Sequence, residues 1–430
     1  MNEMFNFDSY VQPEGIDPGD YVVATYLLRS HSRDILNKVA SMAVEQTTGT
    51  WIKVPGETKE LSEKHQGKVL GVWEVPDFEK EMQTPEDGRH HIFQIAYPVQ
   101  NIGCQIPMLL TTVFGNISMM GDIKLIDLAL PRKFVEGLPG PQFGVSGIRK
   151  LLGVPERPLL NTMIKPSTGI TPEQGAELFY LAALGGTDII KDDEVLGDTD
   201  FSPMLKRVKL YIKKAERVYQ ETGQKIIYTV NVTDEPERCL NKAIEAVNHG
   251  ANAIMVNYLT TGIGILSSLA RNPKIRVPIL AHLDFGGALY ASPYHGISSH
   301  LIYGKLARLA GADIVTIPTP YGKFAISQEK YLKIAMALRT PIFNKERTWP
   351  IAGGAVKQGH LPQLFKDLGK DFIVGAGGAI YAHPMGPKAG ARAFRQGIDL
   401  MVERGGFDES VKDYPELKAA LDHWGIYGKG

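Results

Sequence analysis

The feature that most constrains the fold is a repeat of short apolar runs and amphipathic helices in the C-terminal two thirds of the chain. Continuous apolar runs of this length are typical of parallel strands that are buried on both faces. Glycine closes the helix before several of these runs, as it does at many helix ends. The eight runs lie at residues 159–164, 188–191, 226–231, 253–257, 278–283, 313–318, 349–352 and 372–375. Eight β/α units over roughly 240 residues predict a closed (β/α)8 barrel.

The first 140 residues follow a different pattern. Apolar residues alternate over residues 21–28, as in a half-buried strand, and residues 69–75 and 91–97 resemble further strands. Residues 31–44 have apolar residues at helical spacing. The sequence therefore predicts an α/β protein with a smaller N-terminal α+β sheet domain at 1–140. The (β/α)8 TIM barrel with a helical tail follows at 141–430, after turn-rich residues 138–144. A doubly wound open sheet is the alternative fold, but no Gly-x-Gly-x-x-Gly follows the first barrel strand.

Composition narrows the partners and the location. The chain has 47 Lys and Arg residues against 47 Asp and Glu residues, so we expect no nucleic-acid partner. No apolar run approaches the roughly 20 residues that a membrane helix needs, so we expect no membrane partner. The two cysteines, Cys104 and Cys239, lie too far apart in sequence to suggest a disulfide framework. These features predict a cytoplasmic protein.

The C-terminal ends of barrel strands carry the active site in this fold, and the second strand ends in Lys191-Asp-Asp-Glu194. Alternation places Lys191 and Asp193 on one face, with Glu194 just beyond the strand. One interpretation is a lysine that neutralises two carboxylates. The other is a Mg²⁺ site of hard oxygen ligands, in which CO₂ carbamylates Lys191 and so removes its positive charge.

Other strand ends carry further candidates. Lys165 follows the first strand and is either a surface charge or a catalytic base. Lys323 lies in the loop after strand six. His282 and Asp284 lie at the end of strand five. His282 is either a core histidine or an acid, and Asp284 is either a solvated carboxylate or an acceptor for substrate hydroxyls. Glycines in the last two loops match the phosphate cradle of barrels: Gly353, Gly354, Gly377 and Gly378.

Four segments together resemble the ribulose-bisphosphate carboxylase (RuBisCO) superfamily over nearly the whole chain. They are Glu45-Gln-Thr-Thr-Gly-Thr-Trp51, Phe114-Gly-Asn116, Thr162-Met-Ile-Lys-Pro166 and Gly186-Thr-Asp-Ile-Ile-Lys-Asp-Asp-Glu194. The resemblance implies that carbamylated Lys191 binds Mg²⁺ together with Asp193 and Glu194. It also implies that Lys165 is the proton-shuttling base and that Lys323 closes over the substrate.

The same resemblance implies a phosphate site and an assembly. Thr50 and Trp51 would hold one phosphate together with Gly377 and Gly378. Catalytic Asn116 and the substrate-binding Glu45 would come, with Thr50 and Trp51, from a partner subunit, so the resemblance implies a homodimer or a larger assembly of dimers.

Departures from the carboxylases lie at the far end of the substrate. Ser167 stands where they have a second lysine, and Asp284-Phe285 stands in place of a His-Arg pair. Thr316 and Ala352 replace a histidine and a serine. Losing such charge-assisted contacts removes one of the two phosphate sites. We therefore expect a RuBisCO-like protein whose substrate is a sugar monophosphate, contacted by Ser167, His282 and Phe285, and not a ribulose-bisphosphate carboxylase.

Within the RuBisCO-like proteins, the retention of Lys165 and Lys323 favours the apionate branch. That branch implies a 3-oxo-isoapionate-4-phosphate decarboxylase or transcarboxylase/hydrolase, with Asp284 acting at the non-phosphate end. The alternatives are a methionine-salvage enolase, a 5-methylthioribulose-1-phosphate isomerase and a non-catalytic protein that binds a sugar phosphate.

Overall fold

The computed structural model describes residues 7–49, 54–76 and 88–428. The chain forms two compact units, and each consists of two stretches of sequence. Unit 1 is Met1–Leu138 with Phe285–Ile302, and unit 2 is Pro139–Asp284 with Tyr303–Gly430. Residues 285–302, which the sequence assigned to the second domain, therefore pack with the first. No helix within the described ranges is long and apolar enough to cross a membrane.

Unit 1 contains a five-stranded sheet in the order β10-β4-β1-β3-β2. Every second residue of β1 is buried, as its alternating sequence predicts. The strands are β1 Tyr21–Ser30, β2 Lys68–Val75, β3 Arg89–Pro98, β4 Ile123–Ala129 and β10 Gly296–Ile297. The helices are α1 Ile35–Glu45, α2 Lys59–His65, α3 Ile106–Phe114, α4 Arg132–Glu136 and α10 Gly287–Tyr290. Neither β4 nor β10 is among the strands predicted from the sequence.

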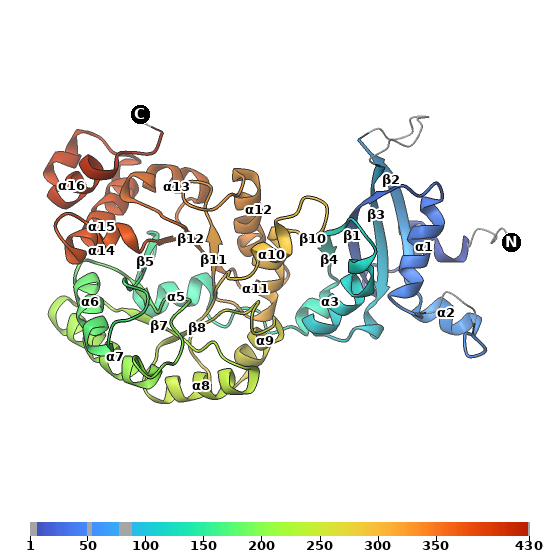
Figure 1. Ribbon diagram of the computed structural model, residues 1–430, viewed down its shortest axis with the longest axis horizontal. Helices are drawn as coiled ribbons and strands as arrows, with labels where there is room; N and C mark the ends of the chain where they lie inside the picture. Colours follow the sequence, from blue (N-terminus) through green and yellow to red (C-terminus); the bar gives the residue numbers. More distant parts are fainter. Residues whose placement is uncertain (1–6, 50–53, 77–87, 429–430) are drawn as a thin grey trace. The chain divides into compact units, whose positions relative to one another are not determined.

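Unit 2 is a closed barrel of eight parallel strands, so the predicted fold class is confirmed. Figure 1 shows its helices around the ring of strands. The strands are β5 Leu159–Met163, β6 Ile189–Lys191, β7 Ile227–Asn231, β8 Ala253–Val256, β9 Ile279–Ala281, β11 Ile314–Pro318, β12 Trp349–Gly353 and β13 Ile373–Gly375. Each overlaps one of the eight predicted runs. The strand predicted at 278–283 is shorter, so His282 and Asp284 lie in the loop after β9.

One barrel helix, α6 (Pro172–Leu184), begins at a side-chain cap that the sequence predicts. Thr171 accepts a hydrogen bond from the Gln174 amide, and Gln174 bonds back to the Thr171 amide, which forms a complete capping box. The helices are α5 Gly144–Leu152, α6 Pro172–Leu184, α7 Met204–Thr222, α8 Pro236–Asn248, α9 Gly264–Arg271, α11 Leu306–Ala310, α12 Gln328–Arg339, α13 Leu361–Leu368, α14 Gly378–Tyr381, α15 Pro387–Arg404 and α16 Pro415–Trp424.

The barrel interior changes from apolar to polar along its axis. One cluster joins Val145, Ile148 and Leu152 of α5 to strand residues such as Leu159 and Ile189, so α5 closes the N-terminal end of the barrel. Two positions further along β6, the same face carries Lys191. The polar groups therefore gather at the C-terminal ends of the strands.

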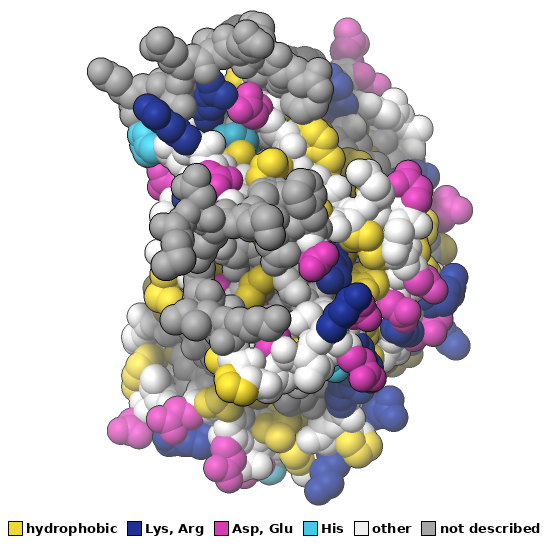
Figure 2. Space-filling model, turned by 90° about the vertical axis from the view of Figure 1, so that its right-hand side faces the viewer, with side chains coloured by type: hydrophobic (Ala, Val, Ile, Leu, Met, Phe, Trp, Pro, Cys, Tyr) yellow, Lys and Arg dark blue, Asp and Glu magenta, His cyan; other side chains and the backbone are white. Residues whose placement is uncertain are grey.

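Surface charge is mixed. On the face drawn in Figure 2, Lys and Arg side chains of the described residues are interspersed with Asp and Glu side chains. This pattern agrees with the balanced composition.

Candidate functional site

Lys165 and Asp193 meet at the mouth of the barrel. Lys165 follows β5 and Asp193 follows β6, and these strands are neighbours in the ring. The Lys165 Nζ donates to Asp193 Oδ2 at 2.5 Å and to Ser167 Oγ at 2.7 Å. The Asp193 side chain is only 3% exposed, whereas that of Lys165 is 35% exposed. The lysine can therefore reach a ligand in the barrel mouth while it contacts a buried carboxylate.

Lys191 points into the barrel and is fully buried. Its Nζ donates to Glu194 Oε2 at 2.8 Å and to the Asp192 carbonyl at 3.0 Å. Burial opposes ionisation of Glu194, but the charge of Lys191 and the nearby His282 outweigh it, so the pKa of Glu194 is lowered from 4.5 to about 2. Glu194 is thus an anion at neutral pH, as a metal ligand must be.

His282 links Glu194 to Asp284. Its Nε2 lies 3.3 Å from Glu194 Oε2 and its Nδ1 lies 3.3 Å from Asp284 Oδ2. His282 is almost completely buried, whereas the Asp284 side chain is 35% exposed. One potential ligand atom from each of these three residues lies within 4.8 Å of the corresponding atoms of the other two, a spacing that could hold a cation. Asp284 therefore extends the row of acidic groups toward solvent.

The donor set fits a magnesium ion. Asp193 and Glu194 supply carboxylate oxygens, which Mg²⁺ prefers, and each is bonded to one ammonium group. With Lys191 as an ammonium, the charges of Lys165, Lys191, Asp193 and Glu194 sum to zero. If CO₂ converts Lys191 to a carbamate, the sum becomes −2, which one Mg²⁺ neutralises. Asp193, Glu194 and carbamylated Lys191 would hold the ion.

The loop that carries Gly377 lies next to the predicted base. A Cβ built on Gly377 would come 2.6 Å from Met163 Sδ and 3.3 Å from Lys165 Cε, so a larger residue here would press on both side chains. The loop after β11 packs on the loop after β12, because the Lys323 amide donates to the Gly354 carbonyl at 3.3 Å. The Lys323 side chain is exposed, and its Nζ lies 5.2 Å from the centre of the Phe324 ring.

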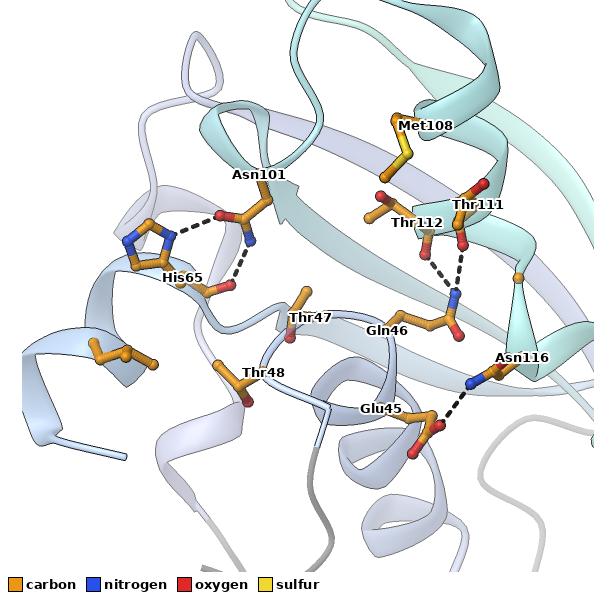
Figure 3. A pocket seen from close by; sticks show the side chains of 12 residues that line it. Glu45, Gln46, Thr47, Thr48, His65, Asn101, Met108, Thr111, Thr112 and Asn116 are labelled. Carbon is orange, nitrogen blue, oxygen red and sulfur yellow. Dashed lines mark hydrogen bonds between the residues drawn. The ribbon is translucent and has the colours of Figure 1, made fainter. Parts of the chain in front are cut away.

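Unit 1 has a separate polar cavity of about 580 Å³ (Figure 3). At one end Asn116 Nδ2 donates to Glu45 Oε1 at 2.9 Å, so these two predicted substrate-binding residues lie together. The rest of the lining is mostly amides and hydroxyls, including Gln46, which donates to the carbonyl of Thr112 at 2.7 Å. The wall therefore offers hydrogen-bonding groups to a ligand.

Of the remaining predicted residues, Gly353 ends β12 and Gly378 begins α14. Thr50 and Trp51 lie outside the described residues. Phe285 belongs to unit 1, is 61% exposed and has a left-handed backbone with φ 68°, which is strained for a phenylalanine. Gly353 is buried and Gly378 is exposed at the start of α14.

Sequence reasoning overlooked Asn231 and Asn257. Both lie at or just after the ends of buried strands, β7 and β8, so the rule that identified Lys165 and Lys191 applied to them as well. Their side-chain amides donate to the Glu194 carbonyl at 3.2 Å and 2.9 Å. They therefore hold the backbone that carries the acidic residues.

Known proteins resemble this chain along its length. The family model for the ribulose bisphosphate carboxylase large chain, catalytic domain, matches residues 144–424, and the model for the N-terminal domain of that chain matches residues 9–134. A ribulose bisphosphate carboxylase-like protein of Archaeoglobus fulgidus is 48% identical over 91% of this chain and 90% of its own.

Two further relatives carry the names of different enzymes. A 2,3-diketo-5-methylthiopentyl-1-phosphate enolase of Bacillus licheniformis is 40% identical over 94% of this chain and 98% of its own. The octameric ribulose-1,5-bisphosphate carboxylase/oxygenase of Pyrococcus horikoshii, solved with sulfate, superposes with a TM-score of 0.89 at 29% identity, covering 99% of this chain and 98% of that one.

Proposed function

This chain belongs to the RuBisCO large-chain family as a RuBisCO-like protein, and from that premise we propose that it is a Mg²⁺-dependent enzyme that enolises a keto sugar monophosphate. The observation that carries the proposal is the contact of Lys165 with Asp193, beside the buried Lys191–Glu194 pair. A base next to an oxygen-ligand metal site is what proton abstraction from a carbon beside a carbonyl requires.

Each residue has a role in this reaction. Carbamylation of the Lys191 ammonium forms a bond between Nζ and the carbon of CO₂ and releases two protons. When bound, Mg²⁺ acts as a Lewis acid that stabilises negative charge on the substrate oxygens. Lys165, in its neutral form, takes the proton from the substrate carbon, and Ser167 and Asp193 orient its Nζ. The amides of Gly377 and Gly378 and the side chain of Lys323 bind the phosphate.

The substrate that the relatives favour is a phosphorylated diketone. The named enolase is 40% identical to this chain across almost the full length of both. The named relatives thus support the enolase alternative and do not support the apionate reaction that the sequence favoured. A specific observation keeps a decarboxylase as the second candidate: the part-exposed carboxylate of Asp284 suits a substrate end that carries hydroxyl groups.

One experiment separates these reactions. The protein, incubated with Mg²⁺ and bicarbonate in D₂O, is given either 2,3-diketo-5-methylthiopentyl 1-phosphate or 3-oxo-isoapionate 4-phosphate. We expect deuterium exchange at the carbon beside the carbonyl of the diketone, and loss of that exchange in Lys191→Ala. Release of CO₂ from the second compound alone would favour the decarboxylase. The absence of both exchange and CO₂ release would refute an enolising enzyme.

We also propose that the active form is a homodimer or a larger homo-oligomer. Glu45 and Asn116 contact each other in unit 1, and a partner subunit would present them to the barrel. The structure of the octameric Pyrococcus horikoshii relative supports assembly of this kind. Sedimentation of the pure protein at several concentrations tests it, and a monomer with full activity would contradict it.

A further inference from the structure

Asp192 lies between two predicted metal-site residues but has a different environment. Strand alternation turns its side chain away from that of Lys191 and toward the surrounding helices. Its carboxylate is completely buried, as is the guanidinium of Arg207 on α7. Arg207 Nη2 donates to Asp192 Oδ2 at 3.1 Å and Arg207 Nε donates to the same oxygen at 3.3 Å.

Two groups of β7 complete the shell around this carboxylate. The Tyr228 hydroxyl donates to Asp192 Oδ1 at 2.8 Å, and the Asn231 amide N–H donates to Asp192 Oδ2 at 3.1 Å. The Asp192 amide in turn donates to the Thr229 carbonyl at 3.0 Å. Asp192 is therefore fixed to α7 and to β7 at once, through both its side chain and its main chain.

The backbone beyond Asp192 is fixed by an amide side chain. Asn231 Nδ2 donates to the carbonyls of Glu194 at 3.2 Å and Leu196 at 3.1 Å. Asn257 Nδ2 reaches the Glu194 carbonyl from the next strand at 2.9 Å. Every one of these contacts is made to the outer side or the main chain of the segment, so the side chains of Asp193 and Glu194 stay available for a cation.

Stability alone does not account for a pair of charges buried here. Desolvation of two ions commonly cancels their attraction, and well-packed apolar side chains of similar volume often serve stability equally well. Directional bonds to Asp192 from two elements instead define the position of the backbone. Partners that orient the ligands of a metal in this way typically change metal affinity by about 10–100-fold when they are removed.

We infer that Asp192, Arg207 and Asn231 are positioning residues, which hold the segment from Lys191 to Leu196 so that its metal-site groups converge on one ion. The inference rests on the proposed magnesium site. The three residues touch neither substrate nor metal, and they act through the backbone of Asp193 and Glu194.

Mn²⁺ binding in bicarbonate buffer, followed by electron paramagnetic resonance, tests the inference. We expect about 10–100-fold weaker binding in Asp192→Asn and in Asn231→Ala. The double variant Asp192→Leu with Arg207→Met leaves no buried charge unpaired, so it should fold, with a lower melting temperature because buried Tyr228 loses its acceptor, and it should still bind Mn²⁺ weakly. Circular dichroism verifies the fold of each variant.

A matched control lies at the other end of the same strand. Arg157 Nη1 and Nη2 donate to Asp188 at 2.7 Å and 2.6 Å, and Asp188 is buried just before β6. Asp188→Asn should lower the melting temperature but leave Mn²⁺ affinity within twofold of wild type. This outcome distinguishes positioning from general loss of stability.

The possible failures are distinguishable. If wild-type protein binds Mn²⁺ but Asn231→Ala and the double variant bind it equally well, the positioning role is refuted and the metal site stands. The same refutation follows if Asp188→Asn weakens Mn²⁺ binding as much as Asp192→Asn does. If the wild-type protein shows no saturable Mn²⁺ binding, the proposed metal site is refuted, and this inference with it.

Discussion

Lys165 holds a carboxylate that the proposed metal also needs, so its removal should have two opposite effects. Lys165→Met deletes the ammonium that lies 2.5 Å from Asp193 Oδ2 but keeps a side chain of similar length. The ammonium competes with a divalent ion for Asp193. The same ammonium, once it has lost its proton, is the proposed base. We therefore expect Lys165→Met to bind Mg²⁺ more tightly and to enolise the substrate far more slowly.

The size of the first effect follows from the electrostatics of the site. Two unit charges about 4 Å apart interact by ~1 kcal/mol in water and by ~4 kcal/mol at an effective dielectric constant of 20. The Lys165 side chain is 35% exposed, which places the interaction at the lower end, about 1–2 kcal/mol. At 1.4 kcal/mol per factor of ten, Mg²⁺ should bind about 5–30-fold more tightly. Loss of the base should slow enolisation by about 10²–10⁴-fold.

Two measurements and one control variant test this reasoning. Calorimetric titration with Mg²⁺ in bicarbonate buffer gives the affinity, and deuterium exchange into the substrate gives the rate. Lys165→Arg retains the charge but cannot act as a base, so it should keep wild-type Mg²⁺ affinity and lose exchange. Weaker Mg²⁺ binding by Lys165→Met would refute the competition, and exchange at the wild-type rate would refute the base.

Three other perturbations have defined outcomes. Lys191→Ala should abolish the bicarbonate dependence of Mg²⁺ binding, measured by the same calorimetry, because no amine remains to be carbamylated. Gly377→Ala should lower the rate of exchange and destabilise the protein by about 1–3 kcal/mol in urea unfolding, because the new Cβ overlaps Met163 and displaces Lys165. Gly406→Ala, whose Cβ meets open space, is the control. In metal-free protein, the Glu194 carboxylate has a pKa of about 2 against an ordinary 4.5, so it stabilises the fold above pH 4.5 and this contribution disappears as the pH falls toward 2. It is worth about 3 kcal/mol at most. Glu194→Gln should therefore flatten the dependence of the melting temperature on pH in that window.

The barrel and much of its mouth could be predicted because both follow from short-range patterns. Apolar runs separated by capped helices define parallel strands, and polar residues at the strand ends then indicate the site. That rule identified Lys165, Lys191 and Glu194, which lie in contact with other polar groups at the barrel mouth. It also covered Asn231, which was overlooked because an amide suggests no chemistry by itself.

Contacts between distant segments could not be predicted. Strand β10 has two residues, Gly296–Ile297, and pairs with Lys124 and Leu125 of β4. A strand this short has no sequence period of its own, since its bonds come from a partner more than one hundred residues away. The pairing of Asp192 with Arg207 is similar, because alternation predicts that Asp192 points outward but does not say which helix residue meets it.

The balance of charge explains why carbamylation and metal binding should be coupled in this site. The charges of Lys165, Lys191, Asp193 and Glu194 sum to zero when Lys191 is an ammonium and to −2 when it is a carbamate. Each of the two ligands, CO₂ and Mg²⁺, therefore relieves the charge imbalance that the other creates, and each must raise the affinity of the other by the same factor. Without the charge of Lys165, the carbamate state reaches −3. Carbamylation of Lys165→Met should then require Mg²⁺ more strictly than wild type does, even though that variant binds the ion more tightly.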